Sequence, residues 1–363
     1  MPIAKRIRYE PDHGTKPGEV LEDYLAAAGM TKAELAARCG RPMKTISEII
    51  HGKTAITPET ALQLERVLGR PASLWQNLEA NYRLHLAVRG ERSDLASHAA
   101  WARKFPLKAM LSRRCFAEPL DDADLVRKLL SFFGVGTVAG WQVRFGATNV
   151  AYRRSPAFKA APTAVTAWLR MGEIEAEQIE CQRFDRKRFR SLLGYVRALS
   201  LKPLHSHVRT KVVALCATAG VAVACVPELP GTHLSGVARW LSKDKALIQL
   251  SGRHRFDDHV WFSFFHEAGH VLLHGKKQVF VDEDGGDKSE VEDEANRFAR
   301  DLLLPPAAFT QFTQAGDFSL AAIKRFASEV GIAPGIVVGR MQHDKLIPYS
   351  AHHELKERTS WTD

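Results

Sequence analysis

The chain has 363 residues, well above the usual size of one domain, so we expect more than one domain. Hydrophobic residues make up 45% of the sequence and charged residues 25%, values that are typical of packed soluble proteins and exclude a largely disordered or fibrous chain. The net charge of +10 favours an acidic partner, with nucleic acid the first candidate, although a solvated basic surface would give the same charge.

The cysteines and the apolar segments point to a reduced cytoplasmic protein. There are 5 cysteines, scattered along the chain without a CxxC pair, so neither a disulfide framework nor a cysteine zinc site is expected. The apolar runs are too short and too interrupted to span a bilayer, and residues 1–10 lack the apolar segment of a secretory signal. We therefore expect a cytoplasmic location and no membrane partner.

Five helical patterns follow one another near the N-terminus. The first runs from Pro17 to Gly29, and the second begins at Thr31 with Glu34 as its capping-box partner. The third, fourth and fifth helices are expected over residues 42–51, 57–69 and 73–86.

The second and third of these helices have the plan of a helix-turn-helix, in which two short helices are joined by a tight turn and the second enters the DNA major groove. The side chains that would reach base edges are those of Met43, Lys44, Thr45 and Ser47. The side chains placed to neutralise phosphates are those of Lys32, Arg41 and Lys53. An αα-hairpin that binds no nucleic acid is the alternative.

A family resemblance supports the DNA-binding interpretation. The segments PGEVLEDYL, TKAELAARCGRPMKTISEIIHGKTAITPETALQLERVLG and ASLWQNLEANYRL resemble the HigA-type antitoxin branch of the Cro and lambda-repressor helix-turn-helix family, over about residues 15–86. The resemblance implies a five-helix domain that binds a palindromic DNA operator, usually as a homodimer. Pro42 stands where the family often has serine, a departure that bears on where the recognition helix starts.

Residues 266–270, His-Glu-Ala-Gly-His, form an HExxH motif. On a helix both histidines lie on one face and can bind one metal ion. Zinc suits two imidazole ligands. Glu267, beside them, is the candidate general base for an attacking water. The apolar flanks WFSFF and VLL predict a buried helix, where unpaired polar side chains are costly. The alternative is a pair of core histidines that bind no metal.

A third ligand is expected from a second helix, which begins near Glu292 and ends before Pro305. Glu292 can share a helix face with Ala295, whereas the competing Glu294 would point elsewhere. The alternative is an acidic helix start whose carboxylates only favour the helix dipole.

A second resemblance covers about residues 225–345. The segments FSFFHEAGHVLLH and EDEANRFARDLLLP resemble the ImmA/IrrE family of zinc metallopeptidases. The resemblance implies that Zn²⁺ is bound by His266, His270 and Glu292, with Glu267 as the catalytic base. His274 also matches a frequent histidine of the family, and we expect it behind the ligands or in the core rather than on the metal.

The segment LSGVARWLSKDKALIQLS, upstream of the motif, would be the strand pair of this family. Its apolar arms flank the polar Lys243-Asp244, which predicts a hairpin. We expect an edge strand there, able to hold an extended peptide by strand addition.

The predicted fold is mainly α with a small β-sheet (α+β). Its four parts are a lambda-repressor-like helix-turn-helix domain, a helical middle of unknown role, a zincin-like metallopeptidase domain and a tail, over residues 1–90, 91–225, 226–345 and 346–363.

Three functions fit this organisation. The leading interpretation is a DNA-binding transcriptional regulator fused to a zinc-dependent endopeptidase that cleaves a repressor or another regulatory protein. The second is a HigA-like antitoxin or repressor, with a toxin partner, whose peptidase-like domain is a non-catalytic sensor or dimerisation scaffold. The third, a zinc-stabilised structural domain, would not need Glu267.

Overall fold

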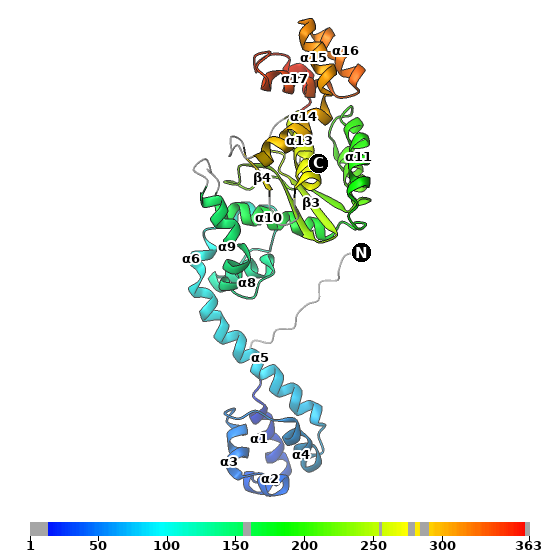
Figure 1. Ribbon diagram of the computed structural model, residues 1–363. Helices are drawn as coiled ribbons and strands as arrows, with labels where there is room; N and C mark the ends of the chain where they lie inside the picture. The colour runs from blue at the N-terminus through cyan, green and yellow to red at the C-terminus, as the bar shows by residue number, and fades with distance from the viewer. Residues whose placement is uncertain (1–13, 155–160, 254–255, 275–279, 284–289, 360–363) are drawn as a thin grey trace. The chain divides into compact units, whose positions relative to one another are not determined.

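A computed structural model of the chain describes residues 14–154, 161–253, 256–274, 280–283 and 290–359 (Figure 1). The protein is mainly helical with one small sheet, so the predicted fold class is confirmed. The described residues divide into two compact units. The first holds the residues up to Ala99 together with Pro119–Arg127, and the second holds Ala100–Glu118 and the residues from Lys128 onward. Among the helices of these residues, none is long and apolar enough to cross a membrane.

Five successive helices begin the first unit. They are α1 (Pro17–Ala28), α2 (Lys32–Cys39), α3 (Met43–Ile50), α4 (Pro58–Leu68) and α5 (Ala72–Ser97). The Thr31 hydroxyl accepts a hydrogen bond from the Glu34 N–H and so caps α2, as predicted. The carboxylate of Glu34 pairs with Arg38 rather than reaching back to the cap. The fully buried centre of the unit is formed by Leu21, Leu35, Ile46, Leu64 and Trp75.

The fifth helix is longer than predicted. It was expected to end near Leu86 but continues to Ser97. Beyond Tyr82 the helix exposes Leu84 and Val88, so the amphipathic pattern fades there although the backbone stays helical. Apart from one glycine, the extension contains no residue that breaks helices. This explains why the helix continues beyond its amphipathic part.

The second unit contains the sheet and most of the remaining helices. Before the sheet come α6 (Ala99–Ala102), α7 (Leu107–Ser112), α8 (Asp122–Phe133), α9 (Val138–Arg154), α10 (Pro162–Glu177), α11 (Arg186–Leu199) and α12 (Ser206–Ala217), of which α6 and α8 begin in the first unit. After β3 come α13 (Asp257–Leu273), α14 (Glu290–Leu303), α15 (Pro306–Ala315), α16 (Leu320–Val330), α17 (Pro334–His343) and a 3-10 turn, His353–Leu355. Most of the predicted helical middle therefore lies in the same compact unit as the sheet.

The sheet has the order β1-β3-β2-β4, with β1 (Val221–Cys225) parallel to β3 (Lys245–Leu250). Strand β2 (Leu234–Ser242) is antiparallel to β3 and to β4 (Phe280–Glu283). The predicted hairpin between β2 and β3 is therefore confirmed.

The expectation that one arm of this hairpin is an edge strand is wrong. Strand β3 lies between β1 and β2, and β2 lies between β3 and β4, so the described edges are β1 and β4. The two arms are buried along most of their length, as strands inside a sheet are. The sequence shows the turn of a hairpin but does not show which more distant strands pair with its outer edges.

Helix α13 connects the sheet to the C-terminal helices. It packs against β2, β3 and β4 on one side and against α14 and α17 on others (Figure 1). It is buried along nearly its whole length, because apolar side chains surround it on all sides. Except for the exposed His259, the polar side chains of this helix therefore lie away from bulk water.

Candidate metal centre and DNA-reading helix

The HExxH motif lies in the C-terminal half of α13. His266 and His270 are each 1% exposed and Glu267 is fully buried. The helix spacing turns both imidazoles toward α14, whose first turn supplies Glu292.

The three predicted ligands come together. The Nε2 atoms of His266 and His270 are 2.9 Å apart, and the Glu292 carboxylate lies 3.1 Å from the first and 3.4 Å from the second. In the described residues these three side chains form a cluster whose ligand atoms all lie within 4.8 Å of one another. A zinc ion with bonds of about 2.0–2.2 Å in a tetrahedron needs ligand atoms roughly 3.3 Å apart, so the donor set and its spacing fit zinc.

A second layer of side chains orients the histidine rings. The Nδ1 atom of His266 lies 3.0 Å from the Asn296 Oδ1, which can only accept, so His266 donates there and its Nε2 carries the lone pair. His270 and His274 face each other through Nδ1 atoms 2.9 Å apart, and the Nε2 of His274 lies 3.2 Å from Glu294. Glu294, the competing candidate, therefore lies behind His274 and outside the cluster of ligand atoms.

The charges of the cluster are tightly coupled. Burial raises the pKa of Glu292, but the adjacent imidazoles of His266 and His270 outweigh burial and lower that pKa to about 2. Burial lowers the pKa of His270, and the neighbouring Glu292 only partly offsets this effect. An ionised carboxylate and a neutral imidazole are the forms that bind a cation.

Strand β2 approaches the candidate base. A Cβ atom built on Gly236 would lie 2.8 Å from the Glu267 Oε1, so only glycine leaves room for the carboxylate at this point of the strand. Sequence reasoning missed both Gly236 and Asn296. A glycine inside a strand pattern and an asparagine one helical turn after Glu292 were the available signals.

The predicted base-reading residues lie on α3. Met43 is 59% exposed and the Lys44 side chain is 85% exposed, while Thr45 and Ser47 are half-buried. Opposite them Ile46, Ile49 and Ile50 are buried and hold the helix on the domain core. The recognition helix starts at Met43 with Pro42 as its N-cap residue.

The predicted phosphate-binding residues flank this helix. The Lys32 ammonium pairs with Glu22 at 2.5 Å, and the Arg41 Nε donates to Gln63 at 2.8 Å. Lys53, just after α3, is exposed. Contacts with DNA are not tested by this geometry, so all seven assignments stay predictions.

Comparisons with known proteins agree with this division of the chain. Residues 21–75 match the helix-turn-helix family, and residues 234–341 match the IrrE N-terminal-like domain. The second match spans the hairpin, the HExxH helix and most of α17. Both family resemblances drawn from the sequence are thereby confirmed.

Several individual proteins are similar to parts of the chain. Virulence-associated protein I of Dichelobacter nodosus is 36% identical over 78 residues, which are 21% of this chain and 72% of that protein. The uncharacterised HTH-type transcriptional regulator YddM of Escherichia coli K12 is 31% identical over 64 residues, 18% of this chain and 68% of that protein.

One similar solved structure is that of a HigA-family addiction module antidote protein from Coxiella burnetii. It is 27% identical, the match covers 23% of this chain and 91% of that chain, and the TM-score is 0.22. Pseudomonas aeruginosa antitoxin HigA, solved with the higBA promoter, has 25% identity, 23% and 90% coverage, and the same TM-score of 0.22. The two family matches and the similarity to virulence-associated protein I show that the chain belongs to the helix-turn-helix family of DNA-binding regulators through its N-terminal part. They also show that it carries an IrrE N-terminal-like domain in its C-terminal part.

Proposed function

We propose that the IrrE-like domain is a zinc-dependent endopeptidase that cleaves a repressor or another regulatory protein. The observation that carries this proposal is the convergence of His266, His270 and Glu292 beside the buried Glu267. A structural zinc site needs ligands only, whereas a buried carboxylate next to them is what a hydrolytic site requires.

The side chains have distinct tasks in this proposal. His266 and His270 would hold Zn²⁺ through Nε2 and Glu292 through its carboxylate, while Asn296 and His274 keep the two rings in place. When bound, zinc supplies Lewis acidity that polarises a carbonyl and makes water a better nucleophile. Glu267 accepts the proton of the attacking water and can deliver it to the leaving amine nitrogen.

We further propose that the N-terminal domain binds a palindromic operator as a homodimer. Helix α3 would lie in the major groove, with Met43 and Lys44 as the most exposed of its candidate base contacts. The division into residues 1–90, 91–225, 226–345 and 346–363 remains part of this proposal, and residues 1–13 and 360–363 lie outside the described residues.

Zinc content and cleavage by the full-length protein test the peptidase. The Glu267→Gln variant should keep one zinc per chain but lose cleavage of a candidate repressor protein, whereas His266→Ala should lose both. Glu329→Gln makes the same chemical change at an exposed site on α16 and should leave both unchanged.

Cleavage by Glu267→Gln at the wild-type rate would refute the endopeptidase. If this variant also leaves the biological output unchanged, the HigA-like antitoxin or repressor with a non-catalytic scaffold becomes the better explanation, and a toxin encoded beside it becomes the expected partner.

A further inference from the structure

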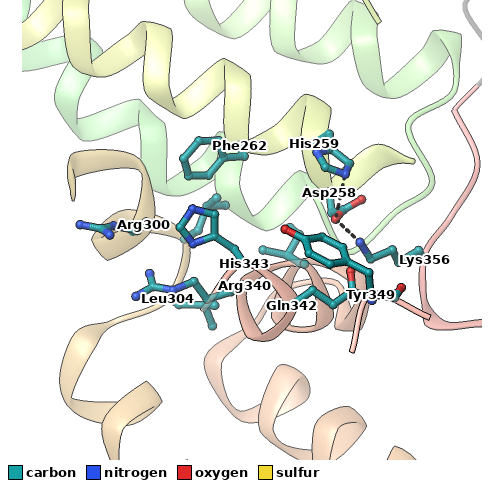
Figure 2. A pocket seen from close by; sticks show the side chains of 13 residues that line it. Asp258, His259, Phe262, Arg300, Leu304, Arg340, Gln342, His343, Tyr349 and Lys356 are labelled. Carbon is teal, nitrogen blue, oxygen red and sulfur yellow. Dashed lines mark hydrogen bonds and ion pairs between the residues drawn. The ribbon is translucent and has the colours of Figure 1, made fainter. Parts of the chain in front are cut away.

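A cavity of about 140 Å³ lies beside α13. Figure 2 shows the side chains that line it. Its walls come from α13, the end of α14, α17 and the segment after α17. His266, His270 and Glu292 do not line it. Phe262 lines the cavity, and its ring centroid is 6.2 Å from that of His266.

The two ends of this cavity differ in charge. At one end Lys356 and Asp258 form a buried ion pair of 2.7 Å, so their charges cancel (Figure 2). Toward the other end lie Arg300, Arg340 and His343 (Figure 2). The guanidinium of Arg340 is balanced by Asp344, to which its Nε donates at 2.6 Å.

Arg300 is the charge that is not balanced. Its Nε is buried and has no hydrogen-bond partner within the part of the chain that the structure describes, and no ion pair of Arg300 occurs there. A buried guanidinium nitrogen without an acceptor is unfavourable, since that nitrogen has lost water and gained no hydrogen bond. Arginine pairs most strongly with a carboxylate, which it can contact through two parallel hydrogen bonds.

The rest of the cavity is apolar. Phe262, Leu304 and Ile336 contribute to its walls, and Tyr349, which is 68% exposed, borders it. Its volume is close to that of an engineered cavity of about 150 Å³ that binds benzene. A single aromatic ring or a short branched alkyl chain would therefore fill it.

We propose that this cavity binds a small organic monocarboxylate, with the carboxylate on Arg300 and the apolar body between α13 and α17. Such a ligand supplies the missing acceptor and buries its apolar part at one site. One negative charge is enough, because the other two cations of the cavity already have carboxylate partners.

Calorimetric titration of the full-length protein with phenylacetate tests the proposal. We expect saturable binding to the wild type, and at least tenfold weaker binding of phenylacetamide, which has the same shape but no charge. Arg300→Gln should weaken phenylacetate binding at least tenfold. Arg300→Lys keeps the charge but not the planar fork of donors, so its affinity for phenylacetate should lie between those of the wild type and Arg300→Gln.

Two controls keep the result specific. Arg325→Gln changes an exposed arginine on α16 and should bind phenylacetate as the wild type does. His266→Ala, which lacks a proposed zinc ligand, should also bind it unchanged, because the proposed site is independent of zinc. Loss of phenylacetate binding in His266→Ala would assign the ligand to the metal centre and overturn the proposal.

The proposal also fails if the wild type does not bind phenylacetate, if phenylacetamide binds equally well, or if folded Arg300→Gln binds unchanged. Far-UV circular dichroism establishes that each variant is folded, and zinc content adds a second check for the variants that keep all three proposed zinc ligands. If Arg300→Gln does not fold, the ratio of the phenylacetate and phenylacetamide affinities of the wild type still tests whether the cavity recognises a carboxylate. If acetyl-Gly-Phe binds more tightly than phenylacetate, the C-terminal end of a polypeptide is the source of the carboxylate. If phenylacetate binds more tightly, the source is a free metabolite.

Discussion

Asn296 and His274 show how single side chains prepare the candidate metal centre. Each contacts the Nδ1 of a proposed ligand and leaves its Nε2 facing Glu292. The sequence motif predicts which histidines bind metal, but it does not show which nitrogen faces the metal. For His266 that choice is made by Asn296, which lies 30 positions away on another helix, and for His270 by His274, four positions away.

Replacing Asn296 should therefore weaken zinc binding. Asn296→Ala removes the acceptor that orients His266, and loss of such a partner typically costs 10–100-fold in metal affinity. Asn296→Asp keeps the acceptor and should bind zinc nearly as the wild type does. Competition with a fluorescent chelator measures both affinities, and an unchanged affinity in Asn296→Ala would contradict the orienting role.

Gly236 sets the space available to Glu267. Gly236→Ala would place a Cβ atom 2.8 Å from the carboxylate, so Glu267 or the strand must shift. We expect proteolysis to fall at least tenfold while the zinc content stays at the wild-type value, since no proposed ligand is touched. Gly194→Ala, at a position in α11 with open space around it, is the matched control and should cleave normally. Full activity of Gly236→Ala would show that Glu267 tolerates displacement.

Asp257 makes the stability of the second unit depend on pH. Burial raises the pKa of this carboxyl from 3.8 to about 7, and the nearby Asp258 and Glu357 add to the effect. The folded state thus holds the proton more tightly than the unfolded chain. The contribution of Asp257 is therefore greatest below its unfolded pKa and is lost as the pH rises to about 7.

Chemical denaturation at pH 5 and pH 8 checks this sign. Asp257→Asn cannot ionise, so the fall in unfolding free energy between these pH values should be smaller than in the wild type, by on the order of 2 kcal/mol. Equal falls in the two proteins would mean that Asp257 does not titrate in this range.

At the scale of elements, α3 is a helix whose buried and exposed faces can be predicted from the sequence. Its buried isoleucines recur at helical spacing, and its exposed side chains follow from that spacing alone. We expect Lys44→Ala combined with Ser47→Ala to lose operator binding at least tenfold and to reduce its salt dependence.

Electrophoretic mobility shifts at several salt concentrations measure this effect. The matched control is Lys324→Ala with Ser328→Ala, the same residue types exposed on α16. It should bind operator DNA as the wild type does. Undiminished binding by the α3 variant would refute the assignment of the recognition helix.

The neighbours of the hairpin strands and the end of α5 are features that the sequence pattern does not predict. The turn at residues 243–244 is visible locally, but the neighbours of β2 and β3 come from strands far along the chain. Likewise the end of α5 is not marked by amphipathicity, because its last turns contribute few buried side chains. Pattern analysis detects an element through burial, so elements or ends that bury little are misjudged.

At the scale of the whole molecule, the two units differ in how local their contacts are. The core of the N-terminal helices comes from one continuous stretch of sequence, and its elements were predicted almost completely. The core of the second unit joins residues from Phe189 to Met341, which lie far apart in the sequence. The cavity beside α13 and the elements that pack against α13 could therefore not be predicted from the sequence.

Two units should respond separately to zinc. An ion that binds only the folded second unit stabilises it by RT ln(1 + [Zn²⁺]/Kd), about 2.7 kcal/mol at a free concentration of 100 Kd. In scanning calorimetry, zinc should raise one unfolding transition and leave the transition of the helix-turn-helix unit in place. A single transition that moves as a whole would show that the units unfold together.

The buried pair of Lys356 with Asp258 has a consequence for the order of events on the ribosome. The two residues are 98 positions apart, and each would be left as an isolated buried charge without the other. The helix-turn-helix unit can finish folding while the rest is still being translated. The HExxH helix, by contrast, is made early but cannot complete its packing until Lys356 has emerged. During synthesis a DNA-reading domain is therefore formed well before the proposed protease is mature.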